Sequence, residues 1–308
     1  MKKILITGGL GNLGSWLTAH FAKNWDVYVL AKNKRPILED QAFTYIPCDI
    51  TNFEECKSVF DSHQFEYIIH TASVNDGFVD NYYKLAIEVN TLGTRNILEA
   101  IKNHKVKHLI YMSTFQVYGK YTGKITEDTP LEPKNDYGNT HLFSEFYLKQ
   151  FEKQVPYSAI RLTNSYGCPL DHDSSKWYLI LNDLSRSAVL NREIVLKSNG
   201  LAPRDFIWMG DVCDIFERLI QSPPKNEVYN LAGERTFTML EIANYVKQAY
   251  YETYGEEIPV RVNTEDTTAY PEPLQVSAQK LKAIVPFDAQ PHFVEEAKKI
   301  FKLAAAKI

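Results

Sequence analysis

A glycine-rich turn close to the start of the chain constrains the fold more than any other feature. The apolar run Ile4–Thr7 leads directly into the sequence Gly8-Gly9-Leu10-Gly11-Asn12-Leu13-Gly14, and an amphipathic stretch follows. This order predicts a buried strand, a tight turn and the start of a helix. In such a turn one of Gly8, Gly11 and Gly14 makes the bend, one lets the backbone approach a pyrophosphate, and one lets the helix pack closely on the sheet.

A turn of this kind presents free backbone N–H groups and the positive end of a helix dipole to a phosphate. We therefore predict a dinucleotide site at this turn, with Asn12 and Leu13 among the residues that contact the cofactor. The spacing is G-x-x-G-x-x-G rather than the more common G-x-G-x-x-G. The alternative interpretation is a glycine-rich turn that binds no ligand.

The first half of the chain alternates between short apolar runs and longer amphipathic stretches. The predicted strands are Ile4–Thr7, Val27–Leu30, Phe43–Ile46, Tyr67–Thr71, His108–Ser113 and Ser158–Leu162. The predicted helices are Leu13–Lys23, Phe53–His63, Tyr82–His104 and Tyr137–Lys153. Such alternation predicts an α/β fold, namely a Rossmann-type doubly wound parallel sheet with helices on both faces.

The alternation ends at about residue 165, where prolines and polar residues enter. We predict a dinucleotide-binding domain that comprises residues 1–164 and a returning segment at about 205–233. A smaller mixed α/β domain, formed by residues 165–204 and 234–308, would bind the substrate.

Composition and charge limit the classes of partner. The 308 residues carry a net charge of −4, which does not favour binding to nucleic acid or to an anionic membrane. No apolar run approaches the ~18 residues of a membrane span, and the start of the chain is unlike a signal peptide. Four scattered cysteines favour free thiols in a reducing compartment, so we expect a cytoplasmic protein. The spacing of the histidines predicts no metal site.

Ligands of open parallel sheets bind at the carboxyl ends of the strands. After the second strand, where NAD enzymes usually carry an acid that binds the ribose hydroxyls, this chain has Ala31. Three cations follow it, namely Lys32, Lys34 and Arg35. Cations without the acid suit a 2′-phosphate, so we expect NADP rather than NAD. The alternative is that these are solvated loop charges.

Further motifs follow the glycine turn in a definite order. They are Asp49-Ile50-Thr51, Asn90-x-x-Gly93-Thr94, Ser113-Thr114-x-x-Val117-Tyr118-Gly119, Tyr137-Gly138, Arg161-Leu162-Thr163-Asn164-x-Tyr166-Gly167 and Arg204-Asp205-Phe206-Ile207. With these motifs the chain resembles an extended short-chain dehydrogenase/reductase of the NAD-dependent epimerase/dehydratase type. That family acts on nucleotide sugars, and the resemblance covers nearly the whole length.

The resemblance implies roles for individual residues. Tyr137 would be the general acid or base for a sugar hydroxyl or keto group, and Thr114 would hydrogen-bond the same oxygen. Asn164 and Arg204 would hold the diphosphate of the sugar nucleotide, and Ser73 would also contact the substrate. The remaining residues expected at the cofactor are Asp49, which would meet the adenine, and Ile50, Thr71, Ala72 and Asn90.

One departure from the family pattern lies on the catalytic helix. The family has a lysine four residues after the tyrosine, and this cation helps a phenol of pKa ~10 to act as a base. This chain has His141 there, which would contact the nicotinamide ribose but, with a pKa of ~6.5, would stabilise a phenolate less well. We therefore expect the rate of reduction to be impaired less than the rate of oxidation. Three hypotheses remain open: an enzyme with altered kinetics, an enzyme tuned to one direction, and a catalytically silent binding protein.

A second departure from the family pattern narrows the class of reaction that we expect. Dehydratases of this family carry an Asp-Glu pair directly after the Ser/Thr, whereas this chain has Phe115 and Gln116. Neither side chain titrates, so we do not expect a 4,6-dehydratase. The leading hypothesis is a 4-keto sugar reductase that uses NADPH. The alternatives are an epimerase with tightly bound NAD(P) and a non-catalytic nucleotide-sugar or dinucleotide binding protein.

The resemblance also implies a homodimer. In it the helices Tyr82–His104 and Tyr137–Lys153 of two subunits would form a four-helix bundle. The apolar residues whose spacing permits this are Leu92, Ile97, Leu98 and Ile101. The same residues could instead face the sheet.

Overall fold

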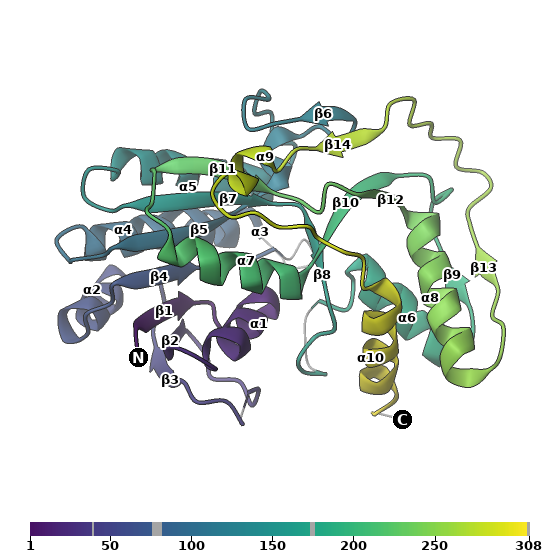
Figure 1. Cartoon of the computed structure of the whole chain (residues 1–308), viewed down its shortest axis with the longest axis horizontal. Helices are drawn as coiled ribbons and strands as arrows, with labels where there is room; N and C mark the ends of the chain where they lie inside the picture. Colours follow the sequence, from purple (N-terminus) through teal and green to yellow (C-terminus); the bar gives the residue numbers. More distant parts are fainter. Residues whose placement is uncertain (39, 76–81, 173–175, 307–308) are drawn as a thin grey trace.

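The computed structural model describes residues 1–38, 40–75, 82–172 and 176–306. Its largest element is a seven-stranded, all-parallel sheet with the strand order β11-β7-β5-β4-β1-β2-β3 (Figure 1). The strands are β1 (Lys3–Thr7), β2 (Asp26–Ala31), β3 (Thr44–Pro47), β4 (Tyr67–His70), β5 (His108–Thr114), β7 (Tyr157–Leu162) and β11 (Glu227–Leu231). The predicted Rossmann-type sheet is thus confirmed, and the strand order reverses between β1 and β4, where such sheets bind their ligands.

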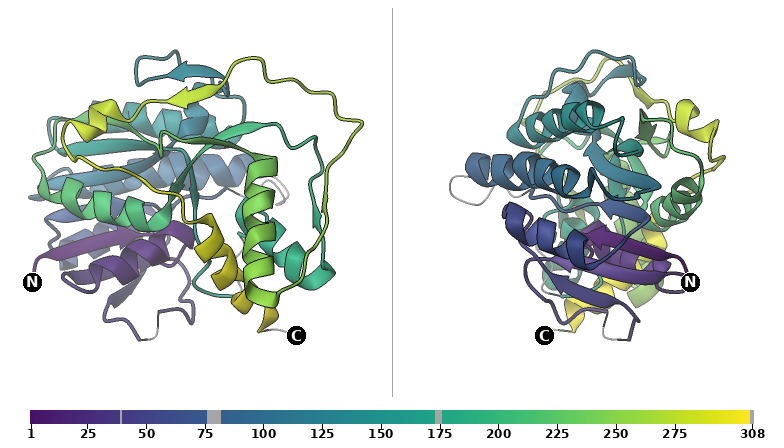
Figure 2. Two further views of the ribbon diagram at one scale, coloured as in Figure 1. Left: turned by 45° about the vertical axis from the view of Figure 1, so that its right-hand side comes forward. Right: turned by 90° about the vertical axis from the view of Figure 1, so that its left-hand side faces the viewer.

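Helices cover both faces of this sheet (Figures 1 and 2). The helices α1 (Asn12–Phe21) and α7 (Met209–Gln221) pack together on one face. On the other face lie α2 (Phe53–Ser62), α4 (Thr94–Ile101) and α5 (Asp136–Gln150). Side chains alternate across a strand, so Ile4 and Ile6 of β1 enter the first core while Leu5 enters the second. Strands that are buried on both faces have to be apolar throughout, which explains the continuous runs of the sequence.

The predicted helix Tyr82–His104 is interrupted. It consists of α3 (Tyr82–Ala86), a π-helical segment η1 (Ile87–Gly93) and α4. Within η1 the carbonyl oxygen of Asn90 accepts hydrogen bonds from the hydroxyls of Thr94 (2.6 Å) and Ser144 (2.7 Å). The Asn90 carbonyl oxygen is thus bonded by side-chain hydroxyls at the place where the α-helical hydrogen-bond pattern gives way to a π-helical one. Short π-helical segments are frequent at functional sites.

A second, smaller lobe stands beside the carboxyl end of the sheet. Its three-stranded sheet has the order β12-β10-β8, formed by β8 (Asn164–Tyr166), β10 (Pro203–Trp208) and β12 (Thr236–Thr238). The helices α6 (Ile180–Asn191), α8 (Met239–Tyr254) and α10 (Phe293–Ala305) pack on one another around a core of their own. The shorter elements are η2 (Phe115–Tyr118), β6 (Gly123–Ile125) paired with β14 (Leu274–Val276), β9 (Ile194–Val195) paired with β13 (Val260–Arg261), and α9 (Gln279–Lys282).

The division into lobes differs from the predicted boundaries near the C-terminus. Leu281, Val285 and Ala289 belong to the core formed by α1, α7 and the large sheet, although the sequence suggests that this stretch lies in the substrate domain. In the described part of the chain, no helix combines the length and apolarity needed to cross a bilayer. Within those residues there is also no cluster of three or more His, Cys, Asp or Glu suited to a metal ion.

Candidate active site

The glycine turn leaves no room for side chains. Gly8 adopts φ +67°, and a Cβ there would lie 2.7 Å from the Cα of Ala72. A Cβ on Gly14 would lie 2.1 Å from the carbonyl oxygen of Gly8. Gly11 is exposed and forms the N-cap of α1, and no side chain caps this helix. The first backbone amides of α1, including those of Asn12 and Leu13, are therefore able to donate hydrogen bonds to a phosphate.

The segment after β4 lies against the end of β1. The Thr71 hydroxyl donates to the carbonyl oxygen of Thr7 (2.7 Å), and the Ala72 amide donates to the Thr7 hydroxyl (3.3 Å). Asn90 holds Val74, two residues further along, through both of its amide atoms, at 2.8 and 3.1 Å. Its Nδ2 also donates to the Thr140 hydroxyl at 3.0 Å. The buried Asn90 side chain thus holds this segment against α5, and its contact with the cofactor stays a prediction.

Two residues expected at the cofactor, Asp49 and Ile50, follow the end of β3. Ile50 is buried against Gly93, and its carbonyl oxygen accepts from Asn96 at 2.9 Å. Asp49 forms an ion pair with Lys32 at 2.6 Å. Burial acts to raise the pKa of Asp49, but hydrogen bonds from Lys32 and Thr51 outweigh it and lower that pKa. The Asp49 carboxylate is therefore charged at neutral pH.

Two of the cations predicted to hold a 2′-phosphate have carboxylate partners. Lys32 pairs with Asp49 as described, and Arg35 pairs with Asp171 at 2.6 Å. Arg35 also donates to the carbonyl oxygen of Leu10, inside the glycine turn, at 2.9 Å. Arg35 thus connects the turn to a loop of the smaller lobe, a role that no sequence pattern indicated.

Tyr137 and Thr114 are supplied by neighbouring elements. Thr114 is the buried last residue of β5, and its hydroxyl accepts from the Gln116 amide at 3.2 Å. Asn135 caps α5 by accepting from the Gly138 amide (2.8 Å), and its Nδ2 donates to Gln116 Oε1 (2.6 Å). The residues on either side of Tyr137 therefore contact the turn that follows Thr114.

The surroundings of the Tyr137 hydroxyl disfavour its anionic form. Burial raises its pKa, the nearby Tyr82 raises it further, and a hydrogen bond with Ser73 only partly opposes them. In the described part of the chain, none of the groups that shift this pKa is a cation. Tyr137 is consequently a neutral phenol at physiological pH, which can donate a proton more readily than it can accept one.

His141 is buried directly beside Tyr137, with 1% of its surface exposed. The two rings meet edge to face, with centroids 4.4 Å apart. His141 Nδ1 lies 2.8 Å from the hydroxyl oxygen of Tyr111, and Nε2 makes no hydrogen bond. Burial, assisted by the nearby His70, lowers the pKa of His141 to about 3. The imidazole is therefore neutral, as the sequence led us to expect, and it carries none of the positive charge of a lysine.

Another buried histidine forms a second polar chain in the same core. His70 Nδ1 lies 2.6 Å from the Thr7 hydroxyl and Nε2 lies 3.0 Å from the Thr94 hydroxyl. Burial lowers the pKa of His70 to about 4, so this ring is neutral too. The bonds of His70 join the ends of β1 and β4 to α4.

A buried ion pair fixes the helix that carries Tyr137 and His141. Glu145, one turn beyond His141, accepts two hydrogen bonds from Arg161, at 3.0 and 2.7 Å. The Ser113 hydroxyl also donates to Glu145, at 2.5 Å, and Arg161 bonds the Tyr118 hydroxyl at 3.0 Å. Sequence reasoning missed this pair, although the four-residue spacing of positions 137, 141 and 145 on one helix face could have indicated it.

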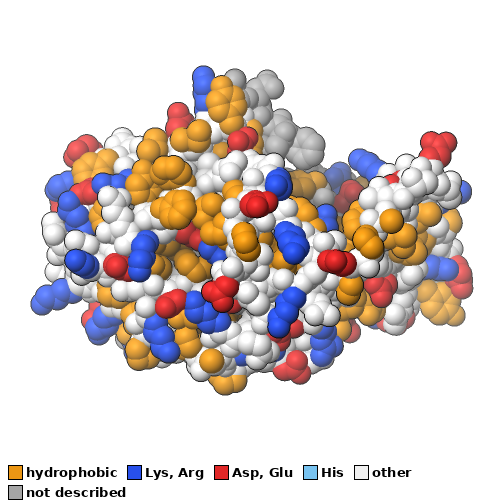
Figure 3. Space-filling view, turned by 90° about the horizontal axis from the view of Figure 1, so that it is seen from above, with side chains coloured by type: hydrophobic (Ala, Val, Ile, Leu, Met, Phe, Trp, Pro, Cys, Tyr) orange, Lys and Arg blue, Asp and Glu red, His pale blue; other side chains and the backbone are white. Residues whose placement is uncertain are grey.

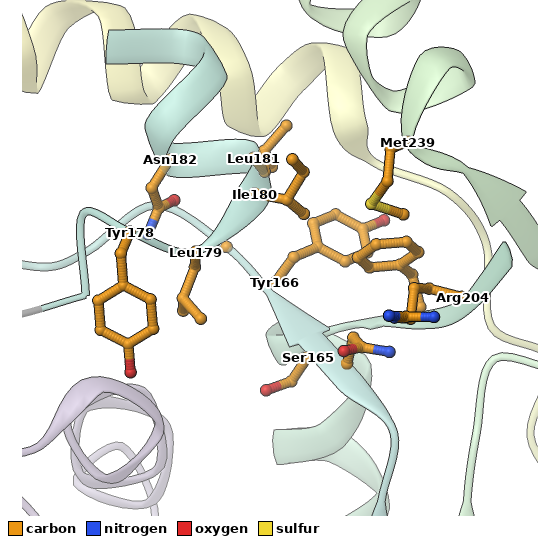
Figure 4. A pocket seen from close by; sticks show the side chains of 12 residues that line it. Ser165, Tyr166, Tyr178, Leu179, Ile180, Leu181, Asn182, Arg204 and Met239 are labelled. Carbon is orange, nitrogen blue, oxygen red and sulfur yellow. The ribbon is translucent and has the colours of Figure 1, made fainter. Parts of the chain in front are cut away.

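The residues predicted to bind the substrate diphosphate meet in a cavity of about 190 Å³ in the smaller lobe. Asn164 and Arg204 both line it, because β8 and β10 pair in parallel beside it. The Arg204 guanidinium lies 4.9 Å from the centroid of the Tyr121 ring. Figure 4 shows Arg204 and Tyr178 on opposite sides of this cavity, with the rings and aliphatic side chains between them. A cationic group facing apolar walls suits an amphipathic anion.

Comparisons with known proteins bear on the family and the fold. A profile of the NAD dependent epimerase/dehydratase family matches residues 4–232. The chain is 27% identical over 277 residues to a dTDP-D-glucose 4,6-dehydratase of Dictyostelium discoideum, a match that spans 80% of this chain and only 62% of that protein. It is 25% identical over 293 residues to a UDP-glucose 4-epimerase of Bacillus subtilis, with 84% of each chain covered.

A solved structure shares the fold over the whole chain. The UDP-glucuronic acid 4-epimerase of Bacillus cereus, in complex with UDP-glucuronic acid and NAD, superposes with a TM-score of 0.82 and 20% identity. The superposition covers 99% of this chain and 100% of that one.

Proposed function

Since the chain belongs to the NAD dependent epimerase/dehydratase family, we propose that it reduces the keto group of a nucleotide-activated sugar, most simply a 4-keto sugar. The observation that supports this direction is the neutral Tyr137 phenol beside a neutral His141. Reduction needs a proton donor at the carbonyl oxygen, whereas oxidation of a hydroxyl needs a phenolate. Among the described residues no cation lowers the pKa of this phenol, and such a site favours reduction.

The residues around the glycine turn fit a dinucleotide. Side chains at Gly8 or Gly14 would collide with the backbone, and the uncapped start of α1 offers its amides to a pyrophosphate. The cofactor, when bound, supplies the hydride that adds to the carbonyl carbon. Tyr137 gives its hydroxyl proton to the carbonyl oxygen as the carbon–oxygen double bond becomes single. Thr114 donates a hydrogen bond to the same oxygen, and Arg204 and Asn164 bind the diphosphate.

We propose NAD rather than NADP as the cofactor, in contrast to the expectation from the sequence. The NADP expectation depended on free cations after β2, but Lys32 and Arg35 are paired with Asp49 and Asp171. A 2′-phosphate beside Arg35 would also meet the Asp171 carboxylate and be repelled by it. The family description, NAD dependent, supports the same choice.

The epimerase hypothesis is the second candidate, because relatives and structural neighbours carry that name. An epimerase would oxidise and re-reduce its sugar with one retained cofactor. Dehydration is not proposed, although one relative is a dehydratase. Phe115 is buried in an apolar cluster and Gln116 bonds Asn135, so neither can exchange protons with a sugar.

A homodimer is part of the proposal. Ile97, Leu98 and Ile101, whose spacing permitted an interface, are fully buried against the sheet side and are unavailable for one. Leu92, the fourth residue of that set, is exposed on η1. Further exposed apolar side chains on the adjoining helices are Tyr83 on α3, Ile87 on η1, and Phe143 and Phe146 on α5. Figure 3 shows the molecule from above, with hydrophobic side chains in orange among charged ones on this face. Such a patch supports association of two copies through these helices.

Incubation of the purified protein with NADH and nucleotide 4-keto sugars, carrying uridine or thymidine diphosphate, tests the function. A reductase consumes one NADH for each sugar reduced, which absorbance and product analysis measure. Interconversion of sugars without net consumption of NADH would favour the epimerase. Binding of both ligands without any turnover would favour the silent binding protein.

A further inference from the structure

The structure joins His141 to a residue that no motif singled out. The Tyr111 hydroxyl, in the middle of β5, lies 2.8 Å from His141 Nδ1 on α5. Both side chains are buried, with 2% and 1% of their surfaces exposed. Each ring is therefore held in place without competition from water.

The neighbouring hydroxyls determine which atom donates in this bond. Thr94 and Ser144 also lie near the Tyr111 oxygen, but their protons go to the carbonyl oxygen of Asn90, at 2.6 and 2.7 Å. The strongest acceptor within reach of the Tyr111 proton is then the lone pair of His141 Nδ1. A neutral histidine that accepts at Nδ1 carries its proton at Nε2.

His70 cannot change this arrangement. The Thr94 proton is already used, so the Thr94 oxygen accepts from Nε2–H of His70, and His70 Nδ1 accepts from the Thr7 hydroxyl. His70 is thereby fixed in one neutral form and offers no proton to Tyr111 or His141.

His141 Nε2 is a buried nitrogen that makes no hydrogen bond of good geometry in the described part of the chain, although the Met112 carbonyl oxygen lies near the ring and opposes the fall in its pKa. Most buried polar groups have a hydrogen-bond partner, so an unpaired donor beside the Tyr137 ring indicates an acceptor that a ligand brings. Nδ1 faces Tyr111, and Nε2 is on the other side of the ring. A sugar hydroxyl oxygen is an acceptor of the required kind.

We propose that Tyr111 is a positioning residue of the active site. By holding Nδ1 it fixes His141 as the Nε2–H form, so that one directed neutral donor bonds a hydroxyl oxygen of the nicotinamide ribose in place of a lysine ammonium. This inference rests on the proposed function in that the ligand is taken to be the dinucleotide. It adds that the histidine needs Tyr111, whereas a lysine at the same position would not.

The protonated nitrogen can be read directly in the unaltered protein. In the ¹⁵N-labelled chain, NMR of the His141 ring, assigned through its backbone resonances, should show a proton on Nε2 and none on Nδ1. The same signal should move on addition of NADH. A proton on Nδ1, or a ring signal whose chemical shift does not change on addition of NADH, would overturn the proposal.

A double-mutant cycle separates positioning from general stability. Tyr111→Phe should weaken NADH binding about tenfold, the scale of one lost hydrogen bond, in the protein with His141. In the His141→Lys background the same change should weaken it less than about twofold. Tyr157→Phe, a buried tyrosine of the neighbouring strand β7, is the matched control and should leave NADH binding unchanged.

The NADH titration is independent of sugar reduction, so the two proposals fail in different ways. Equal losses from Tyr111→Phe in both backgrounds would assign Tyr111 a merely structural role, whatever the reaction. A cycle that behaves as expected in a protein that reduces no sugar would retain the role of Tyr111 and reject the reductase.

Discussion

The aromatic rings of Tyr137 and His141 meet edge to face with their centroids 4.4 Å apart. Burial raises the pKa of the phenol and lowers that of the imidazole, so the two remain neutral together over the physiological range. The pair can donate a proton, but it carries no positive charge that would stabilise the phenolate that results.

Replacing Tyr137 by Phe should remove the proton donor and leave the ring packing against His141 intact. We expect the rate of sugar reduction to fall by about 10²–10⁴-fold, the usual contribution of a positioned acid. NADH affinity, measured by titration of the cofactor fluorescence, should change little. Undiminished turnover in Tyr137→Phe would remove this residue from the mechanism.

The pairing of Arg35 with Asp171 should decide the choice of cofactor. We expect the unaltered protein to bind NADH more tightly than NADPH. Asp171→Ala removes the carboxylate that pairs with Arg35 and would repel a phosphate, so NADPH affinity should rise about tenfold, the scale of one charge-assisted bond to a phosphate. Calorimetric titration with both cofactors measures this.

The control for this change is Asp288→Ala, an exposed acid paired at 3.9 Å with Arg235. It should alter neither affinity. Tighter binding of NADPH by the unaltered protein would instead support the NADP expectation drawn from the sequence.

The stability of the fold should decrease in acid because neutral histidines are buried. Burial lowers the pKa of His108 to about 4, below its ordinary value of ~6.5, and Ser158 and Ile220 bond its ring. Between these two values the unfolded chain binds a proton that the folded chain does not, so stability is full above pH ~6.5 and is lost as the pH falls toward 4.

Each such histidine contributes a slope of up to about 1.4 kcal/mol per pH unit. His108→Gln should reduce the slope by this amount in urea unfolding between pH 6 and 4, even where the absolute stability also falls. The partly buried His104→Gln serves as the comparison. Parallel stability curves for His108→Gln and the unaltered protein would contradict the assignment.

The proposed dimer should depend on the exposed apolar residues of α3, η1 and α5. Phe146 is 60% exposed, so Phe146→Glu should leave the fold intact and place a charge in the interface. Sedimentation should then report a monomer where the unaltered chain is a dimer. Tyr251→Glu, at a tyrosine of α8 that is 56% exposed, should not affect association. A monomeric unaltered chain would refute the interface.

The sequence predicted those parts of the protein that depend on local physical chemistry. Buried parallel strands must be apolar on both faces, and a turn on which a phosphate can sit must have glycine where a Cβ would collide. For that reason the alternating pattern located the strands of the large sheet up to β7, and the glycines at 8 and 14 predicted a turn with no space for side chains. The resemblance to the family, which has lysine four residues after the tyrosine, was enough to single out His141 at that position.

Tertiary structure decided which side chain each polar group meets. Asp171 lies 136 residues from Arg35, and Tyr111 lies 30 residues from His141. No pattern of spacing encodes such pairs, because they arise where separate elements are packed together. Sequence identified the cations after β2 and the histidine on α5, but only the fold paired Arg35 with a carboxylate and placed a phenol against the imidazole. Charge and proton position in a buried site depend on these neighbours, since little water is present to screen them.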